Sequence, residues 1–198
     1  GSNTTIQFND SGATSGSTNF TFNKTTNNVT INGGLIITGS TQNLINGTTL
    51  TEVSSDSDLP STLQSNTTYL IRGNVYTGRT LNVTNSGTSI IGVGRNQSHL
   101  TYTGSNELFN VHNQSFSIKS LTMKSSGSIM VAQNVTPGAA YNDGRTKVLD
   151  IKDCQVKNTN NVMSVSGFEL VDINNCLFWY ITGSQGLQFK SVRHLELS

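Results

Sequence analysis

A repeated template in the second half of the sequence restricts the possible folds more than any other feature. It occurs in the segments Phe116–Met123, Leu149–Val156 and Val171–Phe178. In each segment, two alternating apolar residues precede two polar residues, and two more alternating apolar residues follow. Alternation places each apolar pair on one face of a strand, and the polar interruption bends the chain so that both pairs face the same interior. The template therefore predicts a bent pair of strands that recurs along the chain.

The spacing of the template predicts a solenoid. Positions 149 and 171 lie 22 residues apart, and the same step from Ile173 predicts a further rung with Leu195 in the equivalent place. The step from Phe116 to Leu149 is longer, and the excess falls in Pro137–Gly144, which we expect to be a loop extruded from one corner. Equal periods with insertions at corners are typical of solenoids. We therefore expect a right-handed parallel β-helix.

The composition agrees with an ordered β-rich chain. Hydrophobic residues make up 33% and charged residues 12% of the sequence, so its polarity comes from uncharged Asn, Thr, Ser and Gly. The net charge of +1 is too small for a disordered chain. We find no basic stripe, which argues against nucleic-acid binding, and no apolar run near the roughly 20 residues that span a bilayer. No membrane insertion is expected.

The pattern along the chain divides it into three regions. Residues 1–50 alternate short β-prone runs with Asn-Gly and Gly-Gly turns, and are predicted to be a β-rich attachment or stalk segment. Each run has too few apolar residues for a core, so this segment is expected to pack in a homotrimer or against a neighbouring protein. Residues 51–68 are interpreted as a linker or cap, and residues 69–198 as the β-helix. Ser198 falls in mid-rung, so we expect the β-helix to be incomplete and the natural protein to continue.

Two resemblances extend this interpretation. The rungs resemble those of the pectate-lyase-like right-handed β-helix, in which an Asn commonly occupies the tight turn between two strands in a left-handed conformation. Asn175 fits that position best, and Asp153 and Ser120 occupy it in the preceding repeats. The segments 6–12, 20–26 and 29–34 are similar to segments of tail-fibre proteins of phages and large viruses. This resemblance implies a virion-surface, extracellular protein attached to other virion proteins through its N-terminal segment.

Polar columns on the outside of the β-helix supply the candidate catalytic residues. The repeat predicts that Asp150, Asp172 and His194 stack on neighbouring rungs, and that Lys152, Asn174 and Glu196 form the next column. Paired carboxylates about 5–9 Å apart are what glycoside hydrolysis requires, so Asp150 with Asp172 or Glu196 is a candidate pair. The competing interpretation is that these are solvated or subunit-facing side chains, because any solenoid whose outward positions are polar produces such columns.

Other chemistry-bearing residues allow further alternatives. Cys154 and Cys176 are predicted to stack on consecutive rungs, either as small buried side chains or as a disulfide. No cofactor and no metal are expected, because His99, His112 and His194 have no metal-ligand spacing. Trp179 and Tyr180 follow an apolar pair, and one of them is expected to face outward. Such an aromatic side chain either stacks on a glycan or is buried between subunits.

Three functional hypotheses are consistent with these features. The leading one is a homotrimeric virion fibre or spike that recognises a host cell-surface glycan through many weak contacts. The second is a tailspike-type enzyme, a glycoside hydrolase or lyase that degrades polysaccharide. It requires converging carboxylates in a chain with only 11 acidic residues. The third is a capsid or connector element without a ligand.

Overall fold

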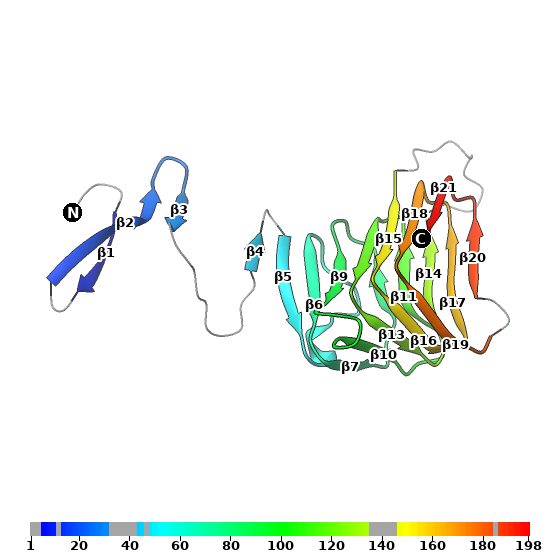
Figure 1. Ribbon diagram of the computed structural model, residues 1–198. Helices are drawn as coiled ribbons and strands as arrows, with labels where there is room; N and C mark the ends of the chain where they lie inside the picture. Colours follow the sequence, from blue (N-terminus) through cyan, green and yellow to red (C-terminus); the bar gives the residue numbers. More distant parts are fainter. Residues whose placement is uncertain (1–4, 11–12, 32–42, 46–47, 135–145, 184–185) are drawn as a thin grey trace. The chain divides into compact units, whose positions relative to one another are not determined.

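In the residues that it describes, the computed structural model is all-β apart from one short 3₁₀ turn (Figure 1). The structure describes residues 5–10, 13–31, 43–45, 48–134, 146–183 and 186–198. The chain divides into two compact units, Gly1–Ser40 and Thr41–Ser198. In the described residues, no helix is long and apolar enough to cross a membrane. Each unit has its own sheets.

The smaller unit is a three-stranded antiparallel sheet. Its strands are β1 (Thr5–Asp10), β2 (Ala13–Asn23) and β3 (Asn28–Ile31), in that order across the sheet. The β2–β3 turn forms because the Asn23 side chain accepts hydrogen bonds from the backbone N–H groups of Thr25 and Thr26, at 2.9 and 3.2 Å. Asn27 completes the turn in a left-handed conformation, with φ of 55°. Part of the predicted stalk segment is therefore a hairpin-based sheet.

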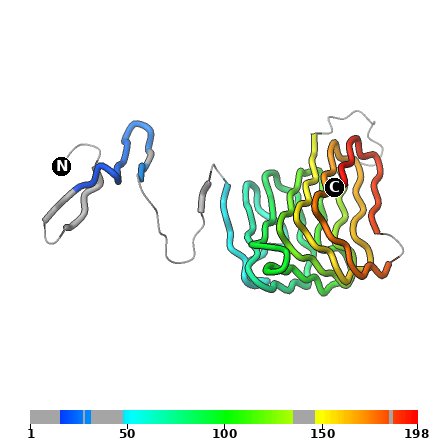
Figure 2. Tube along the Cα trace, viewed as in Figure 1, coloured from blue at the N-terminus to red at the C-terminus, as the bar shows by residue number. Residues whose placement is uncertain are grey.

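The larger unit is a parallel β-solenoid of about five turns, as predicted. Each turn passes through three sheets in the same order, so strands that are far apart in sequence lie side by side, as the chain path in Figure 2 shows. Sheet 1 contains β4 (Asn43–Ile45), β5 (Thr48–Val53), β6 (Thr67–Ile71), β9 (Ser89–Gly92), β12 (Phe116–Lys119), β15 (Val148–Lys152), β18 (Leu170–Asn174) and β21 (His194–Leu197). Sheet 2 contains β7 (Asn74–Thr77), β10 (His99–Tyr102), β13 (Thr122–Ser125), β16 (Gln155–Thr159) and β19 (Leu177–Ile181). Sheet 3 contains β8 (Leu81–Val83), β11 (Glu107–His112), β14 (Ser128–Gln133), β17 (Asn161–Ser166) and β20 (Leu187–Lys190).

The core consists of apolar columns that run along the solenoid axis. Ile90, Ile118, Ile151 and Ile173 pair in register in sheet 1, and each is at most 2% exposed. Burying one such side chain contributes about 1.5–3 kcal/mol. In the first two template repeats, Phe116–Met123 and Leu149–Val156, every apolar template residue is buried. The alternation in the sequence thus determines which side chains face the interior.

The corner between sheets 1 and 2 has the predicted left-handed residue in three successive turns. Ser120, Asp153 and Asn175 have φ values of 54°, 53° and 50°. Asn175 Nδ2 also donates a 2.6 Å hydrogen bond to Asp153 Oδ1 on the preceding turn. Short polar side chains tolerate this conformation because they can hydrogen-bond locally. The predicted left-handed conformation of these three residues is therefore confirmed.

The register of the last turn corrects one prediction. Leu195 pairs with Val171, and Glu196 pairs with Asp172, so the step is 24 residues rather than 22. In sheet 2, Thr159 pairs with Ile181, which keeps the 22-residue step. In sheet 3, Met163 pairs with Leu187, which is a step of 24 residues. The two extra residues therefore enter between β19 and β20. The predicted extruded loop, Pro137–Gly144, lies outside the described residues.

Residues 51–68 form the first layer of the larger unit. β5 pairs in parallel with β6, and η1 (Asp56–Asp58) lies between them. Val53, Leu59 and Leu63 from this stretch are buried in the core. The segment interpreted as a linker or cap from its polar composition thus contributes apolar side chains to the end of the solenoid.

Candidate functional site

The outer faces of sheets 1 and 2 carry different side chains, although both are built by the same repeat. Outward positions occur two per strand and stack in columns about 4.8 Å apart per turn. On sheet 1, one column has hydroxyl side chains followed by carboxylates. Its members are Thr68, Ser89, Ser117, Asp150, Asp172 and Glu196. On sheet 2, one column reads Tyr76, Thr101, Lys124, Lys157 and Trp179.

Two carboxylates of sheet 1, Asp150 and Asp172, are paired with lysines. Asp150 contacts Lys119 Nζ at 3.2 Å and Lys152 Nζ at 3.0 Å, and Lys152 Nζ also contacts Asp172 Oδ2 at 2.9 Å. The three predicted candidates Asp150, Asp172 and Glu196 share one column, because each pairs with the next on the adjacent strand. His194 is not in that column, because it pairs with Leu170. This corrects the predicted pairing of His194 with the two aspartates.

The electrostatics of sheet 1 suit an ion-pair network. Burial acts to raise the pKa of Asp150, but hydrogen bonds from Lys152 and Lys119 outweigh it and the net pKa is lowered. The hydrogen bonds that Lys152 donates to Asp172 and Asp150 raise its pKa. A general acid in glycoside hydrolysis needs a carboxyl group whose pKa is raised. Asp150 is therefore held as a carboxylate, the opposite of what that role requires.

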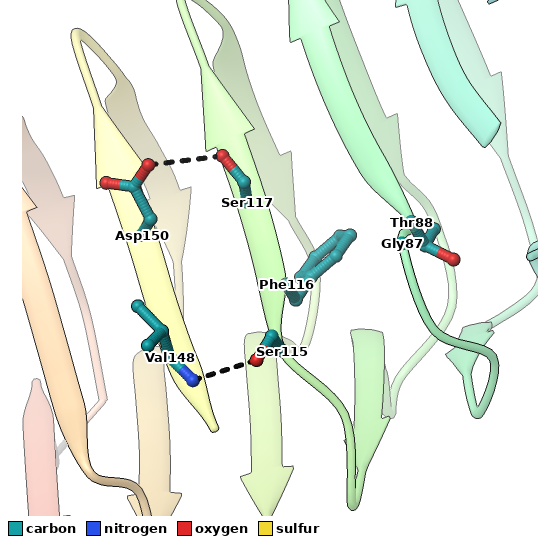
Figure 3. Close-up of a pocket in the computed structure, with 7 residues that line it drawn as sticks. All are labelled: Gly87, Thr88, Ser115, Phe116, Ser117, Val148 and Asp150. Carbon is teal, nitrogen blue, oxygen red and sulfur yellow. Dashed lines mark hydrogen bonds between the residues drawn. The ribbon is translucent and has the colours of Figure 1, made fainter. Parts of the chain in front are cut away.

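A shallow pocket of about 200 Å³ lies beside this column. As Figure 3 shows, it is lined by Gly87, Thr88, Ser115, Phe116, Ser117, Val148 and Asp150. Ser117 Oγ donates to Asp150 Oδ2 at 3.4 Å, and Val148 N–H donates to Ser115 Oγ at 3.0 Å. Most of the polar groups in the pocket are therefore already engaged with one another. Its lining offers one carboxylate, which two lysines neutralise.

The histidines lie on three different sheets. His99 is on sheet 2, His112 on sheet 3 and His194 on sheet 1. Among the described residues, no group of three or more His, Cys, Asp or Glu side chains is arranged to hold a metal ion.

The outer face of sheet 2 is basic and aromatic. Lys124 and Lys157 are neighbours on adjacent strands, and the exposed Tyr76 and Trp179 lie at the two ends of the column, 62% and 49% exposed. The other outward column contains Asn74, His99, Thr122, Gln155 and Leu177. Among the described strands of sheet 2, no outward position is acidic. The five strands of this sheet lie side by side along the lower edge of the solenoid in Figure 1.

The lysines of sheet 2 lack the partners that the lysines of sheet 1 have. In the described part of the chain, neither Lys124 nor Lys157 forms an ion pair. Their positive field reaches His99, whose pKa is lowered first by burial and then by Lys124 and Lys157. The positive charge of Lys124 and Lys157 on this face is therefore not offset by an ion pair within the described residues.

The border of this face is formed by a loop and a corner. The loop between β9 and β10 covers Thr122, whose hydroxyl donates to the Arg95 carbonyl oxygen. The Arg95 guanidinium donates in turn to the Asn175 carbonyl oxygen at 3.2 Å. At the far corner, Tyr180 is 74% exposed and adopts a left-handed conformation with φ of 52°. Trp179 and Tyr180 are thus both exposed, although only one was expected to face outward.

The two cysteines lie in the predicted stacked arrangement. Cys154 is buried, Cys176 is partly buried, and both are free thiols in this structure. Leu177 N–H donates to the Cys154 carbonyl oxygen at 2.9 Å, which places the cysteines at equivalent positions of adjacent turns. A hydrogen bond between the two side chains lowers the pKa of the Cys176 thiol. The stacking is as predicted.

A sequence signal for the basic column lies one residue beyond the template. Lys124, Lys157 and Trp179 each follow the last apolar residue of one template repeat. Extending the template by one residue would have brought these three into register. Tyr76 and Thr101 have no such signal, because their turns lack the template.

Comparisons of the chain with protein-family models, with curated proteins and with solved structures gave no match.

Proposed function

We propose that this chain is the rigid body of a virion-surface fibre or spike, and that the outer face of sheet 2 recognises a host cell-surface glycan. The observation that carries the proposal is the column from Tyr76 to Trp179, in which two exposed aromatic rings flank Lys124 and Lys157. Aromatic rings provide apolar stacking surfaces for sugars, and ammonium groups donate hydrogen bonds to hydroxyl and acidic groups.

The shape of the face supports the same proposal. A parallel sheet of five strands presents a long, regular surface, because each turn repeats the same backbone path. The column spans four strand spacings, roughly 19 Å. A glycan chain lying along the axis would meet one outward side chain per turn. Individually weak contacts of this kind become effective when several copies act together.

The smaller unit supports a multimeric fibre. Phe20 pairs with Ile31 and Phe22 pairs with Val29, so all four side chains lie on one face of the three-stranded sheet. Each remains between 36% and 54% exposed. An apolar face of this kind is stabilised when it packs against a second copy of itself. We therefore propose that this sheet joins the copies of a homotrimer and attaches them to other virion proteins.

The second candidate function is cleavage of polysaccharide. The observation that favours it is that Asp150, Asp172 and Glu196 lie in register, about one strand spacing apart. The ion pairs of Asp150 and Asp172 with Lys152 weigh against it. Binding without cleavage is therefore the function that the arrangement supports better.

A glycan-binding assay with the intact chain tests the proposal. We expect immobilised cell-surface glycans to retain the protein and Trp179→Ala to lose that binding, whereas Trp179→Phe retains most of it because a ring is still present. Gln188→Ala, on the outer face of sheet 3, is the matched control and should bind normally. Retention of no glycan, or equal loss by the control, would contradict the proposal and favour a connector without a ligand.

The oligomeric state is tested independently. The intact chain should have the mass of a trimer in light scattering, and Phe22→Ser should reduce it to a monomer while the solenoid keeps its circular dichroism spectrum. A monomeric intact chain would contradict the role proposed for the smaller unit.

A further inference from the structure

The two lysines of sheet 2 form an electrostatically unfavourable pair. Lys124 and Lys157 lie opposite each other on adjacent parallel strands. Like charges directly opposite each other destabilise a sheet. On sheet 1, the lysines at comparable positions, Lys119 and Lys152, have Asp150 between them. Within the described residues, one lysine pair thus has a carboxylate partner and the other has none.

No other charged group described on this face compensates the pair. The outward positions of the described sheet 2 strands contain no carboxylate. Asp153, an acidic residue at the corner between sheets 1 and 2, accepts a hydrogen bond from Asn175 Nδ2 through its Oδ1. Arg95, at the same border, adds another positive charge. An anion placed between the lysines would therefore relieve their mutual repulsion and gain two charge-assisted hydrogen bonds.

We infer that the ligand of sheet 2 is an anionic glycan, whose acidic group lies between Lys124 and Lys157 while flanking sugar rings stack on Trp179 and Tyr76. The inference rests on the proposed function and specifies the chemistry of its ligand. The shared chemistry is a sugar bearing a carboxylate or a sulfate. Lysine binds both as a point charge, so the face does not select between them by geometry.

The small number of charges distinguishes this ligand from a nucleic acid. Two lysines neutralise at most two anionic groups, which predicts a slope of log K against log salt no steeper than about −2. A nucleic-acid-binding surface typically neutralises more phosphates and has a steeper slope. The aromatic ends of the column contribute binding that salt does not screen.

The test measures binding of the intact chain to three polysaccharides by calorimetry. These are a polyuronate with its carboxylates, the same polymer after chemical reduction of the carboxylates to alcohols, and a sulfated glycosaminoglycan. We expect the reduced polymer to bind about tenfold more weakly than the polyuronate, equivalent to the loss of one charge-assisted contact. Comparing the polyuronate with the sulfated polymer identifies which acidic group is preferred.

Charge-removing variants locate the site. Lys124→Gln and Lys157→Gln should each weaken binding of the acidic polymer about tenfold and leave binding of the reduced polymer unchanged. Lys190→Gln is the matched control, because it removes one exposed lysine from sheet 3. Unfolding temperatures of all three variants show whether the fold is retained.

The outcomes separate the inference from the proposed function. If Trp179→Ala abolishes binding but both lysine variants bind the acidic polymer as well as the original chain, the ligand is a neutral glycan and the inference is wrong. If no polymer binds, the proposed function itself fails. If single-stranded DNA competes as well as the acidic polymer, the face is a general polyanion surface, which also overturns the inference.

Discussion

Sheets 1 and 2 show how one repeat can build two chemically opposite surfaces. In each template repeat, the first strand enters sheet 1 and the second enters sheet 2, and in the first two repeats both strands bury their apolar side chains on the inside. On the outside, sheet 1 has a column with Asp150 and Asp172 beside a column with Lys119 and Lys152, whereas sheet 2 carries ammonium groups and aromatic rings. The core therefore constrains only the inward positions. The outward columns can differ in composition without changing the fold.

The largest effect is expected when the shared core, rather than either face, is changed. Ile118→Ala should lower the free energy of unfolding by about 2–5 kcal/mol, because it leaves a cavity in the isoleucine column. Urea unfolding measures the loss. An effect below about 1 kcal/mol would indicate that the outer columns, and not the core, hold the turns in register.

A smaller effect is expected on sheet 1. Asp150→Asn should lower the free energy of unfolding by about 1 kcal/mol near pH 7, because Lys119 and Lys152 lose their shared carboxylate. The pKa of Asp150 is lowered in the folded state, so its contribution is present above about pH 4 and is lost as the pH falls through the folded pKa. The variant should therefore lose less stability than the original chain on acidification. Equal acid sensitivity of the two proteins would show that the network contributes nothing.

The corresponding change on sheet 2 should have the opposite sign. Lys157→Gln should raise the free energy of unfolding by up to about 0.5 kcal/mol, because it removes repulsion with Lys124. Thermal unfolding at low salt is the suitable measurement, and the gain should shrink as salt screens the charges. Destabilisation by this variant would mean that Lys157 has a stabilising partner, and the contrast between the faces would disappear.

The smallest effect is expected from His99. Its pKa is lowered by burial and by Lys124 and Lys157, so the unfolded chain binds a proton more readily than the folded chain. Stability should therefore fall slightly as the pH drops below about 6.5, and His99→Gln should remove that decrease. Binding of an acidic glycan should change in the other direction and tighten over the same range, because the bound anion favours protonated His99. Binding that is independent of pH would place the anion away from His99.

Much of the fold was predictable because it depends on local pattern. Alternating apolar residues identified the strands that contain Ile118, Ile151 and Ile173, and short polar residues identified the left-handed corners at Ser120, Asp153 and Asn175. The register of the last turn was not predictable from a 22-residue period. The two extra residues between β19 and β20 leave sheet 2 in the old register and shift sheets 3 and 1.

The candidate site was predictable only in part. One of Trp179 and Tyr180 was expected to face outward, and both are exposed. No basic stripe was recognised in the sequence, because Lys124 and Lys157 lie 33 positions apart in the chain. Nor did the carboxylate pattern of Asp150 and Asp172 indicate that Lys119 and Lys152 would neutralise them.

The amino-acid sequence by itself determined that the chain would wind as a β-solenoid and which side chains would face inward, because hydrophobic alternation and turn chemistry act over a few residues. Only the tertiary structure decided which outward side chains become neighbours. Parallel pairing brings residues one turn apart to within one strand spacing. The length of a turn varies, from 22 residues between Asp153 and Asn175 to 33 residues between Ser117 and Asp150. Whether a lysine meets an aspartate, as Lys152 does, or another lysine, as Lys124 does, depends on that register.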